Sequence, residues 1–212
     1  EKSVKAHEGT WLKIAKNAFE VRGKKLGIIG YGHIGAQVSV LAEAMGMQVL
    51  YYDVVPKLPM GNAQSVSTLE ELLAESDVVT LHVPGTPQTK EMITARELSL
   101  MKKGAGLINL SRGNVIVIDA LKAALESGHL RGAAVDVFPL EPKRKGDKFT
   151  SPLQGLDNVI LSPHIGGSTE EAQENIGTDA ATKLANYMDT GSTINSHSIP
   201  ELHLPIQKNT NR

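Results

Sequence analysis

The sequence contains no cysteine, which excludes disulfide frameworks, zinc sites with thiolate ligands and catalysis by a thiol. It also lacks an excess of one charge, because 22 basic side chains accompany 23 acidic ones in 212 residues. We therefore expect no broad field that attracts nucleic acid or an anionic membrane. No apolar run approaches the roughly 20 residues that cross a bilayer, and residues 1–9 are polar rather than signal-like. These absences favour a cytoplasmic protein whose partners are not nucleic acid, membrane or metal ions.

The apolar segments that are present have the length of β-strands, and they are nearly continuous rather than alternating. This pattern is typical of parallel strands that are covered on both faces. We expect six such strands, at residues 25–30, 48–53, 77–83, 105–111, 132–138 and 158–162.

Helix signals lie between these segments. A first helix is expected over residues 34–45, because Gly46 suits the left-handed residue that ends a helix. Further helices are expected at capping boxes, formed by Ser67 with Glu70, Thr94 with Glu97, and Ser168 with Glu171. Strands that alternate with helices predict an α/β fold with a doubly wound parallel sheet and right-handed crossovers.

The last part of the chain carries three further expectations. The last helix should pack an apolar stripe on the sheet or on a neighbouring domain, through Ala172, Ile176, Ala180, Leu184 and Met188. Residues 139–155 are rich in proline, glycine and charge and should form an exposed loop. The chain begins with Glu1 and ends in a polar tail, so we interpret it as a piece of a longer protein.

Three glycines follow the first expected strand, within the segment LGIIGYGHIGAQ. Gly30, Gly32 and Gly35 have the spacing G-x-G-x-x-G, which in isolation fits an ordinary turn better than a binding site. Here the motif ends a strand and opens a helix, which is the context of dinucleotide binding. The first glycine then permits a tight turn, the second lets a pyrophosphate approach, and the third allows close helix packing. The helix N-terminus supplies amide hydrogens and partial positive charge to the phosphates.

An acidic residue stands where the second strand ends. Asp53 follows Gly35 by 18 positions, close to the interval of about 20 expected for the residue that binds the adenosine ribose. A carboxylate there repels a 2′-phosphate, so NAD is favoured over NADP. Flavin cofactors use a similar fingerprint, and the glycine loop alone does not separate them from NAD.

Three polar residues come just past the ends of expected strands, where ligands collect in an open parallel sheet. Arg112 offers a planar fork of donors that matches a substrate carboxylate. Histidine titrates near neutrality, so His164 suits a general base that takes a hydroxyl proton, with Glu141 orienting the imidazole. Taken alone, Arg112 also fits a surface cation, Glu141 an acid in a solvated loop, and His164 a residue before a turn. Together they predict NAD-dependent oxidation of a 2-hydroxy acid.

At these residues the sequence resembles the D-2-hydroxyacid dehydrogenase family, and within it the bacterial-type enzymes that oxidise D-3-phosphoglycerate. The matching segments are GIIGYGHIG, SRG, AAVDVFPLEP and LSPHIGGSTEEAQENIG, and the likeness runs from about residue 9 to residue 205. The intervals of 29 and 23 positions between Arg112, Glu141 and His164 are also similar. The resemblance implies a Rossmann-type NAD-binding domain. It also implies oxidation of D-3-phosphoglycerate to 3-phosphohydroxypyruvate, the first committed step of serine biosynthesis.

The resemblance further implies roles for individual residues. Arg112 would bind the substrate carboxylate, and His164 would act as acid and base with Glu141 as its partner. The implied cofactor contacts are His33 and Ile34 at the pyrophosphate, Asp53 at the ribose, Leu110 and Arg112 near the nicotinamide, Asp136 at its carboxamide, and Gly166 and Gly167 in the loop after His164. His82 resembles a family position near the adenosine, although a structural histidine fits that place equally well.

This chain is shorter than the family's pattern. In the family about a hundred residues that build most of a substrate domain come first, and the phosphoglycerate type usually adds a regulatory domain at the end. We therefore expect residues 1–8 to lead in from the missing substrate domain, residues 9–190 to form the NAD-binding domain, and residues 191–212 to be a return segment or linker. This domain alone is expected to bind NAD without full turnover.

Two other functions are compatible with the same residues. Another dehydrogenase of the family would act on glyoxylate, hydroxypyruvate or lactate. A non-catalytic relative would sense NAD or NADH and use it to control association. Glu141 argues only against formate dehydrogenases, in which glutamine stands there. Related enzymes are dimers or tetramers, so a homo-oligomer is expected.

Overall fold

The computed structural model describes residues 7–11, 13–15, 18–144, 146–194, 196 and 200–202. The chain divides into two units, Glu1–Ser162 and Pro163–Arg212. The strands found among the described residues belong to the first unit, and the longest helix belongs to the second. Most of the expected lead-in and much of the expected C-terminal linker lie outside the described residues. The domain boundaries expected from the sequence stay a prediction.

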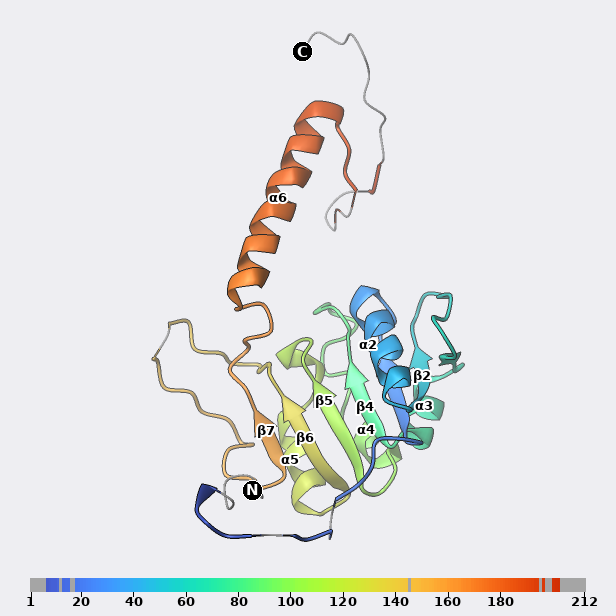
Figure 1. Ribbon diagram of the computed structural model, residues 1–212, viewed down its shortest axis with the longest axis vertical. Helices are drawn as coiled ribbons and strands as arrows, with labels where there is room; N and C mark the ends of the chain where they lie inside the picture. Colours follow the sequence, from blue (N-terminus) through green and yellow to red (C-terminus); the bar gives the residue numbers. More distant parts are fainter. Residues whose placement is uncertain are drawn as a thin grey trace. The chain divides into compact units, whose positions relative to one another are not determined.

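The first unit is built on a seven-stranded sheet in the order β3-β2-β1-β4-β5-β6-β7, in which every neighbouring pair is parallel (Figure 1). The strands are β1 Lys25–Ile29, β2 Gln48–Tyr52, β3 Gln64–Ser65, β4 Val78–Leu81, β5 Ala105–Asn109, β6 Leu130–Val135 and β7 Val159–Leu161. Six of them overlap the six expected segments. The short β3 was not predicted, because both of its residues are polar and exposed. The predicted doubly wound parallel sheet is confirmed.

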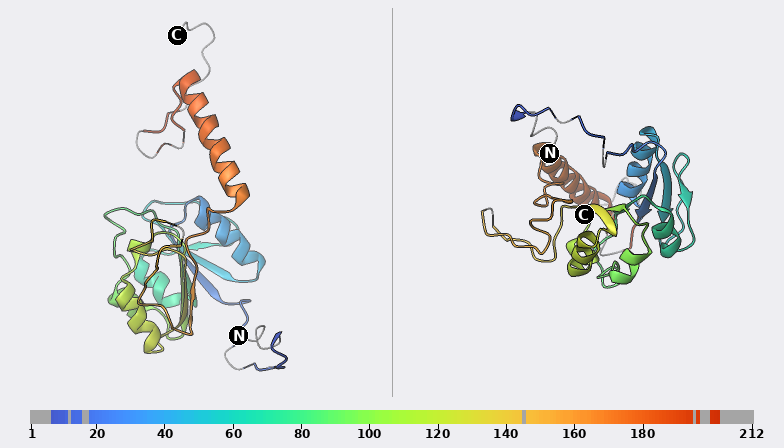
Figure 2. Two further views of the ribbon diagram at one scale, coloured as in Figure 1. Left: turned by 90° about the vertical axis from the view of Figure 1, so that its left-hand side faces the viewer. Right: turned by 90° about the horizontal axis from the view of Figure 1, so that it is seen from below.

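Helices cover both faces of the sheet (Figure 2). Two hydrophobic cores lie between these helices and the sheet. On one face α2, His33–Ala44, packs on β1 and β2. On the other face α3 (Leu69–Glu75), α4 (Ala95–Leu100) and α5 (Ile118–Glu126) cover the larger core. The neighbouring residues Ile28 and Ile29 of β1 belong to different cores, as expected for a strand that is buried on both sides.

Two of the three expected capping residues are wrong by one position. Thr68 rather than Ser67 caps α3, and Thr169 rather than Ser168 caps α6, Glu170–Thr190. Each threonine hydroxyl accepts a hydrogen bond from the amide of the third helical residue, at 3.1 Å in α3 and 3.0 Å in α6. Both sites contain the pair Ser-Thr, and either hydroxyl has the chemistry of a cap, so the motif alone does not fix the position.

The third capping box, at Thr94 and Glu97, is confirmed at the start of α4. The Thr94 amide and hydroxyl both donate to Oε2 of Glu97, and Arg96 donates to Oε1 at 2.7 Å. Burial raises the pKa of Glu97, but these hydrogen bonds outweigh burial and lower the pKa from 4.5 to about 2. Because the folded pKa is depressed, the charged carboxylate stabilises the fold above pH 4.5, and this stabilisation is lost as the pH falls toward 2.

We expect Glu97→Gln to reduce the acid sensitivity of the fold. Between pH 7 and pH 3 the unsubstituted protein should lose about 2 kcal/mol more stability than this variant, as measured by urea unfolding at both pH values. Glu126→Gln is the matched control, because Glu126 forms a surface pair with Lys122 at 3.6 Å. The same loss of stability with and without the Glu97 carboxylate would contradict this account.

The segment 139–155 is not exposed throughout, in contrast to the expectation. Leu153 is fully buried, and Phe149 packs edge-on against Phe138 with ring centroids 4.6 Å apart. Proline, glycine and charge predict a loop here, but they do not show which of its few apolar side chains anchor it to the core.

The helix α6 carries the apolar stripe expected to pack on the sheet or on another domain. None of its residues is buried, so this packing stays a prediction. Among the described residues, no helix combines the length and the apolar character that a bilayer span requires.

Candidate coenzyme and substrate site

The strand order defines where a ligand is expected. The chain winds outward from β1 to β2 and β3, then returns to the other side of β1 and continues from β4 to β7. The winding therefore reverses between β1 and β4. In open parallel sheets, ligands bind at this point outside the carboxyl ends of the strands. The glycine loop follows β1 there, and His82 follows β4.

The three glycines of the loop differ in what surrounds them. Gly30 turns the chain with a φ of +90°, and a Cβ there would lie 2.5 Å from the His82 carbonyl oxygen. A Cβ on Gly35 would lie 2.2 Å from the Gly30 carbonyl oxygen, so α2 begins tightly against the strand end. A Cβ on Gly32 would have no neighbour within 4 Å. The loop is thus packed on one side and open at Gly32, which fits the approach of a phosphate group.

The N-terminus of α2 has the properties of an anion site. Gly32 is its N-cap residue, no side chain caps it, and its first turn contains no acidic residue. The free amides of this turn and the helix dipole are therefore available to a phosphate. His33 and Ile34, expected at the pyrophosphate, are exposed at this end of the helix.

Asp53 lies at the end of β2, and backbone amides hold both of its carboxylate oxygens. Oδ2 accepts a hydrogen bond from the Tyr31 amide at 2.8 Å, and Oδ1 accepts one from the Val55 amide at 2.9 Å. Because Tyr31 stands between the first two glycines, the carboxylate is tied directly to the glycine loop. Each oxygen retains a lone pair that is able to accept a hydrogen bond from a hydroxyl group.

A cleft of about 550 Å³ opens beside the glycine loop. It is lined by Ile34, Val38, Thr80, His82, Val83, Pro84, Ile108, Leu110, Ser111 and Arg112. Apolar walls with a few polar groups are typical of pockets for small molecules and cofactors. The first unit thus brings four of the expected site residues, Ile34, His82, Leu110 and Arg112, to one cleft.

His82 is held in place within this cleft. Its Nε2 lies 3.0 Å from the Thr80 hydroxyl oxygen. Burial lowers the pKa of His82 below its ordinary value and so favours the neutral ring. Because a neutral, hydrogen-bonded ring serves equally as a wall of the cleft and as a coenzyme contact, the role of His82 stays a prediction.

A tight turn after β5, residues 109–113, presents Arg112 to the cleft; we call it the arginine turn. The fully buried Asn109 side chain accepts hydrogen bonds from the Ser111 amide at 3.1 Å and hydroxyl at 2.9 Å, and donates to the Arg112 carbonyl at 3.0 Å. The Arg112 side chain lies against Gly85, and its Nη1 donates to the Ser111 carbonyl at 2.6 Å. Its remaining N–H groups are suited to a carboxylate.

The segment after β6 carries Asp136 and Glu141 beside the arginine turn. The amide of the buried Asp136 donates to the Asn109 carbonyl at 3.1 Å. A Cβ on Gly113 would lie 2.0 Å from the Phe138 carbonyl carbon, so the two backbones are in direct contact. The Phe138 amide in turn donates to Oε1 of Glu141 at 2.9 Å. Both expected acids are therefore anchored on a segment that touches the arginine turn.

His164, Gly166 and Gly167 belong to the second unit, not to the first. His164 has a φ of +52°, a left-handed conformation that is uncommon for a residue with a side chain. The Ser168 amide donates to the Ile165 carbonyl at 3.0 Å and closes a turn after it. Such backbone strain often accompanies functional positions, and the roles of these three residues stay predictions.

The comparison with family models decides the identity of this domain. The family described as D-isomer specific 2-hydroxyacid dehydrogenase, NAD binding domain, matches residues 1–166. The chain belongs to this family. The family and the coenzyme NAD expected from the sequence are thereby confirmed.

Individual relatives show which members of the family this chain is similar to. D-3-phosphoglycerate dehydrogenase of Escherichia coli (strain K12) is 59% identical over 206 residues, which cover 97% of this chain and 50% of that protein. D-3-phosphoglycerate dehydrogenase 2 of Saccharomyces cerevisiae is 52% identical over 212 residues, covering 96% of this chain and 45% of that protein. The NAD-complexed D-isomer specific 2-hydroxyacid dehydrogenase of Lactobacillus delbrueckii ssp. bulgaricus superposes with a TM-score of 0.75 at 30% identity, covering 86% of this chain and 58% of that one. The chain spans about half the length of the curated relatives it matches.

Sequence reasoning missed the residues that hold the loops of this dehydrogenase domain in place. Asn109 fixes the arginine turn, and Tyr31 joins the glycine loop to Asp53. A signal existed for Asn109, because it is the polar end of the otherwise apolar segment AGLIN. None existed for Tyr31, because a tyrosine at a variable position of the glycine motif carries no information about its partners.

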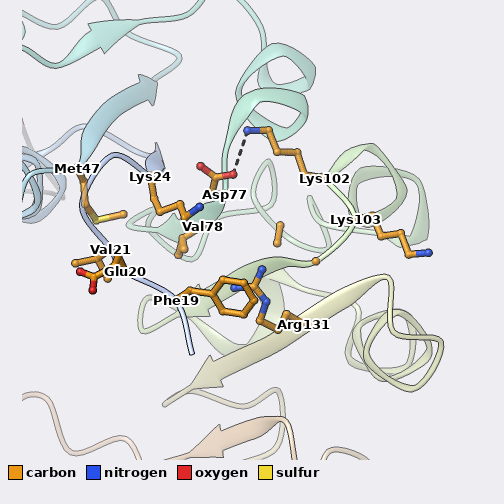
Figure 3. Close-up of a pocket in the computed structure, with 12 residues that line it drawn as sticks. Phe19, Glu20, Val21, Lys24, Met47, Asp77, Val78, Lys102, Lys103 and Arg131 are labelled. Carbon is orange, nitrogen blue, oxygen red and sulfur yellow. Dashed lines mark hydrogen bonds and ion pairs between the residues drawn. The ribbon is translucent and has the colours of Figure 1, made fainter. Parts of the chain in front are cut away.

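A second cavity, of about 370 Å³, lies at the opposite edge of the sheet (Figure 3). The Arg131 guanidinium lies over the ring of Phe19 at 3.7 Å from its centroid, and Lys102 donates to Asp77 at 3.2 Å. In an NAD-binding dehydrogenase domain the coenzyme binds at the carboxyl edge, so this cavity is not the coenzyme site. The stacking of Arg131, in β6, on Phe19 instead holds the segment before β1 against the sheet.

Proposed function

We propose that the full-length protein oxidises D-3-phosphoglycerate to 3-phosphohydroxypyruvate with NAD, the reaction that begins serine biosynthesis. The observation that carries this choice of substrate is the 59% identity, over 97% of the chain, to a protein named D-3-phosphoglycerate dehydrogenase. The cleft that joins the glycine loop to Arg112 supports the reaction class. The proposal includes a cytoplasmic homodimer or homotetramer, as the sequence resemblance implies.

In this proposal the chain's own residues bind the substrate and move one proton. Arg112 binds the carboxylate of the 2-hydroxy acid through paired N–H donors, which places the hydroxyl-bearing carbon beside the coenzyme. The His164 imidazole takes the hydroxyl proton as the carbonyl bond forms. Bound NAD would supply the acceptor for the hydride that leaves the same carbon. Glu141 stabilises the imidazolium that results.

The test is reduction of NAD by the full-length protein with a panel of hydroxy acids. We expect NADH formation, followed at its near-ultraviolet absorbance, to depend on D-3-phosphoglycerate. Higher kcat/KM with D-lactate or D-glycerate would assign another substrate of the family, since D-glycerate is the reduced partner of hydroxypyruvate. NAD binding without turnover of any hydroxy acid would support a sensor of NAD and NADH instead.

Asp53→Ala is expected to weaken NAD binding by about 10- to 100-fold, because hydrogen bonds to a charged acceptor are lost. NADP binding should change less, since the variant also removes the charge that repels its 2′-phosphate. Calorimetric titration with both coenzymes measures this preference. The matched control is Asp157→Ala, at an exposed aspartate in the loop before β7. A preference for NAD equal to that of the unsubstituted protein would move coenzyme selectivity to other residues.

A further inference from the structure

A buried network connects the glycine loop to its neighbours through the side chains of Tyr31, Tyr51 and Ser39. None of the roles proposed above uses this network. The three residues come from three elements, the glycine loop, β2 and α2, and are 3%, 2% and 0% exposed. The two tyrosine rings are stacked, with centroids 3.8 Å apart and 19° between their planes. The network borders residues 53–63, which we call the β2–β3 loop.

The hydrogen bonds of this network have a defined direction. Ser39 donates its hydroxyl proton to the Ala36 carbonyl at 2.7 Å, so it accepts the bond from the Tyr31 hydroxyl, also at 2.7 Å. The Tyr31 oxygen in turn accepts a hydrogen bond from the Met60 amide at 3.1 Å. Each donor is used once, so removal of the Tyr31 oxygen leaves the Met60 amide without its acceptor and the Ser39 oxygen without its donor.

Tyr31 therefore holds the β2–β3 loop at two points. Its amide binds the carboxylate of Asp53 at the start of the loop, and its hydroxyl binds Met60 farther along. Tyr51 adds a third point, because its hydroxyl donates to the Lys57 carbonyl at 2.8 Å. The same pair of stacked rings thus connects the glycine loop to the loop that begins with the proposed ribose acceptor.

Apolar packing holds this loop mainly at its end, where Ala63 is buried in the core. Val54 and Leu58, two of its apolar side chains, are 84% and 90% exposed. Glu43 of α2 supplies a further polar contact, with Oε1 accepting a hydrogen bond from the Asn62 amide at 2.6 Å. The position of the loop depends on such polar contacts, and the buried hydroxyl of Tyr31 provides one of them from within the glycine loop.

We propose that Tyr31 is a positioning residue for coenzyme selectivity. Its hydroxyl, through Met60, fixes the β2–β3 loop and with it the Asp53 carboxylate, in the place that accepts a ribose hydroxyl and repels a 2′-phosphate. This inference rests on the proposed role of Asp53. A looser loop lets the carboxylate change its orientation about the retained contact with the Tyr31 amide, which weakens the hydrogen bonds to NAD and relieves the repulsion of NADP.

The test is calorimetric titration of the full-length protein carrying Tyr31→Phe with NAD and with NADP. The substitution keeps the stacked ring and the backbone contact to Asp53, and removes one oxygen. We expect NAD to bind about 3- to 10-fold more weakly, and the preference for NAD over NADP to fall by a similar factor. Tyr52→Phe is the matched control, because the Tyr52 hydroxyl makes none of the hydrogen bonds found among the described residues.

The outcomes separate this inference from the proposed function. A changed preference in Asp53→Ala together with an unchanged preference in Tyr31→Phe overturns the inference alone. Equal weakening of both coenzymes in Tyr31→Phe also overturns it, since a merely structural residue would do the same. An unchanged preference in Asp53→Ala overturns the proposed role of Asp53 itself. If Tyr31→Phe does not fold, Met60→Pro provides the same test, because proline lacks the amide N–H that donates to the Tyr31 oxygen.

Discussion

His164→Ala in the full-length protein is expected to lower kcat for hydroxy-acid oxidation by about 10²- to 10⁴-fold, the range that positioned proton transfer contributes. The affinity for NAD should stay close to that of the unsubstituted protein, because the base acts on the substrate hydroxyl. Steady-state kinetics with D-3-phosphoglycerate measures kcat, and titration with NAD measures the affinity.

His129→Ala is the control for the histidine substitution. The ring of His129 lies within 3.0 Å of the Leu98 carbonyl oxygen and has no place in the proposed chemistry. The His129→Ala variant should keep the kcat of the unsubstituted protein. Turnover of His164→Ala at the rate of the unsubstituted protein would refute the role of His164 as general base. A loss of NAD affinity as large as the loss of kcat would make His164 a coenzyme contact instead.

The second large effect is expected from substitutions of two glycines in the glycine loop after β1. Gly35→Ala should lower the free energy of unfolding by about 2–3 kcal/mol, because the new methyl group meets rigid backbone rather than a flexible side chain. Gly32→Ala should leave stability unchanged, since its Cβ would meet no atom within 4 Å. The same methyl group should weaken NAD binding by about 10-fold or more, because it occupies the approach of the pyrophosphate.

Urea unfolding and calorimetric titration of the two variants distinguish packing from binding. Each variant is the control for the other, because both add one methyl group to the same motif, at positions three residues apart. Loss of stability in Gly32→Ala would show that this glycine is also packed. Full NAD affinity in that variant would place the pyrophosphate elsewhere.

The parts of the fold that depend on local patterns were predictable. Continuous apolar segments locate six strands, because parallel strands are buried on both faces whatever their order. The start of α2 after Gly32 follows from the glycine motif. Two capping residues were predicted one position away from the true ones, because a Ser-Thr pair offers two equivalent hydroxyls. The strand β3 was missed because two polar residues have no apolar pattern.

The site was predictable to the extent that its residues follow strands. Arg112 and His82 reach one cleft because parallel strands end at the same edge. Asn109 apart, the supports behind them were not predictable, because most of their partners are distant in sequence. The Tyr31 hydroxyl meets Ser39 and the Met60 amide, and the contact of Gly113 with Phe138 exists only once β5 and β6 are paired.

The two outer strands of the sheet have a consequence for assembly. β3 contains two residues and β7 three, so each offers few unpaired backbone groups to an incoming strand. Short edges of this kind discourage one molecule from extending the sheet of another, which is how many proteins avoid aggregation. We therefore expect this domain to remain dispersed at concentrations where long open edges would form fibres.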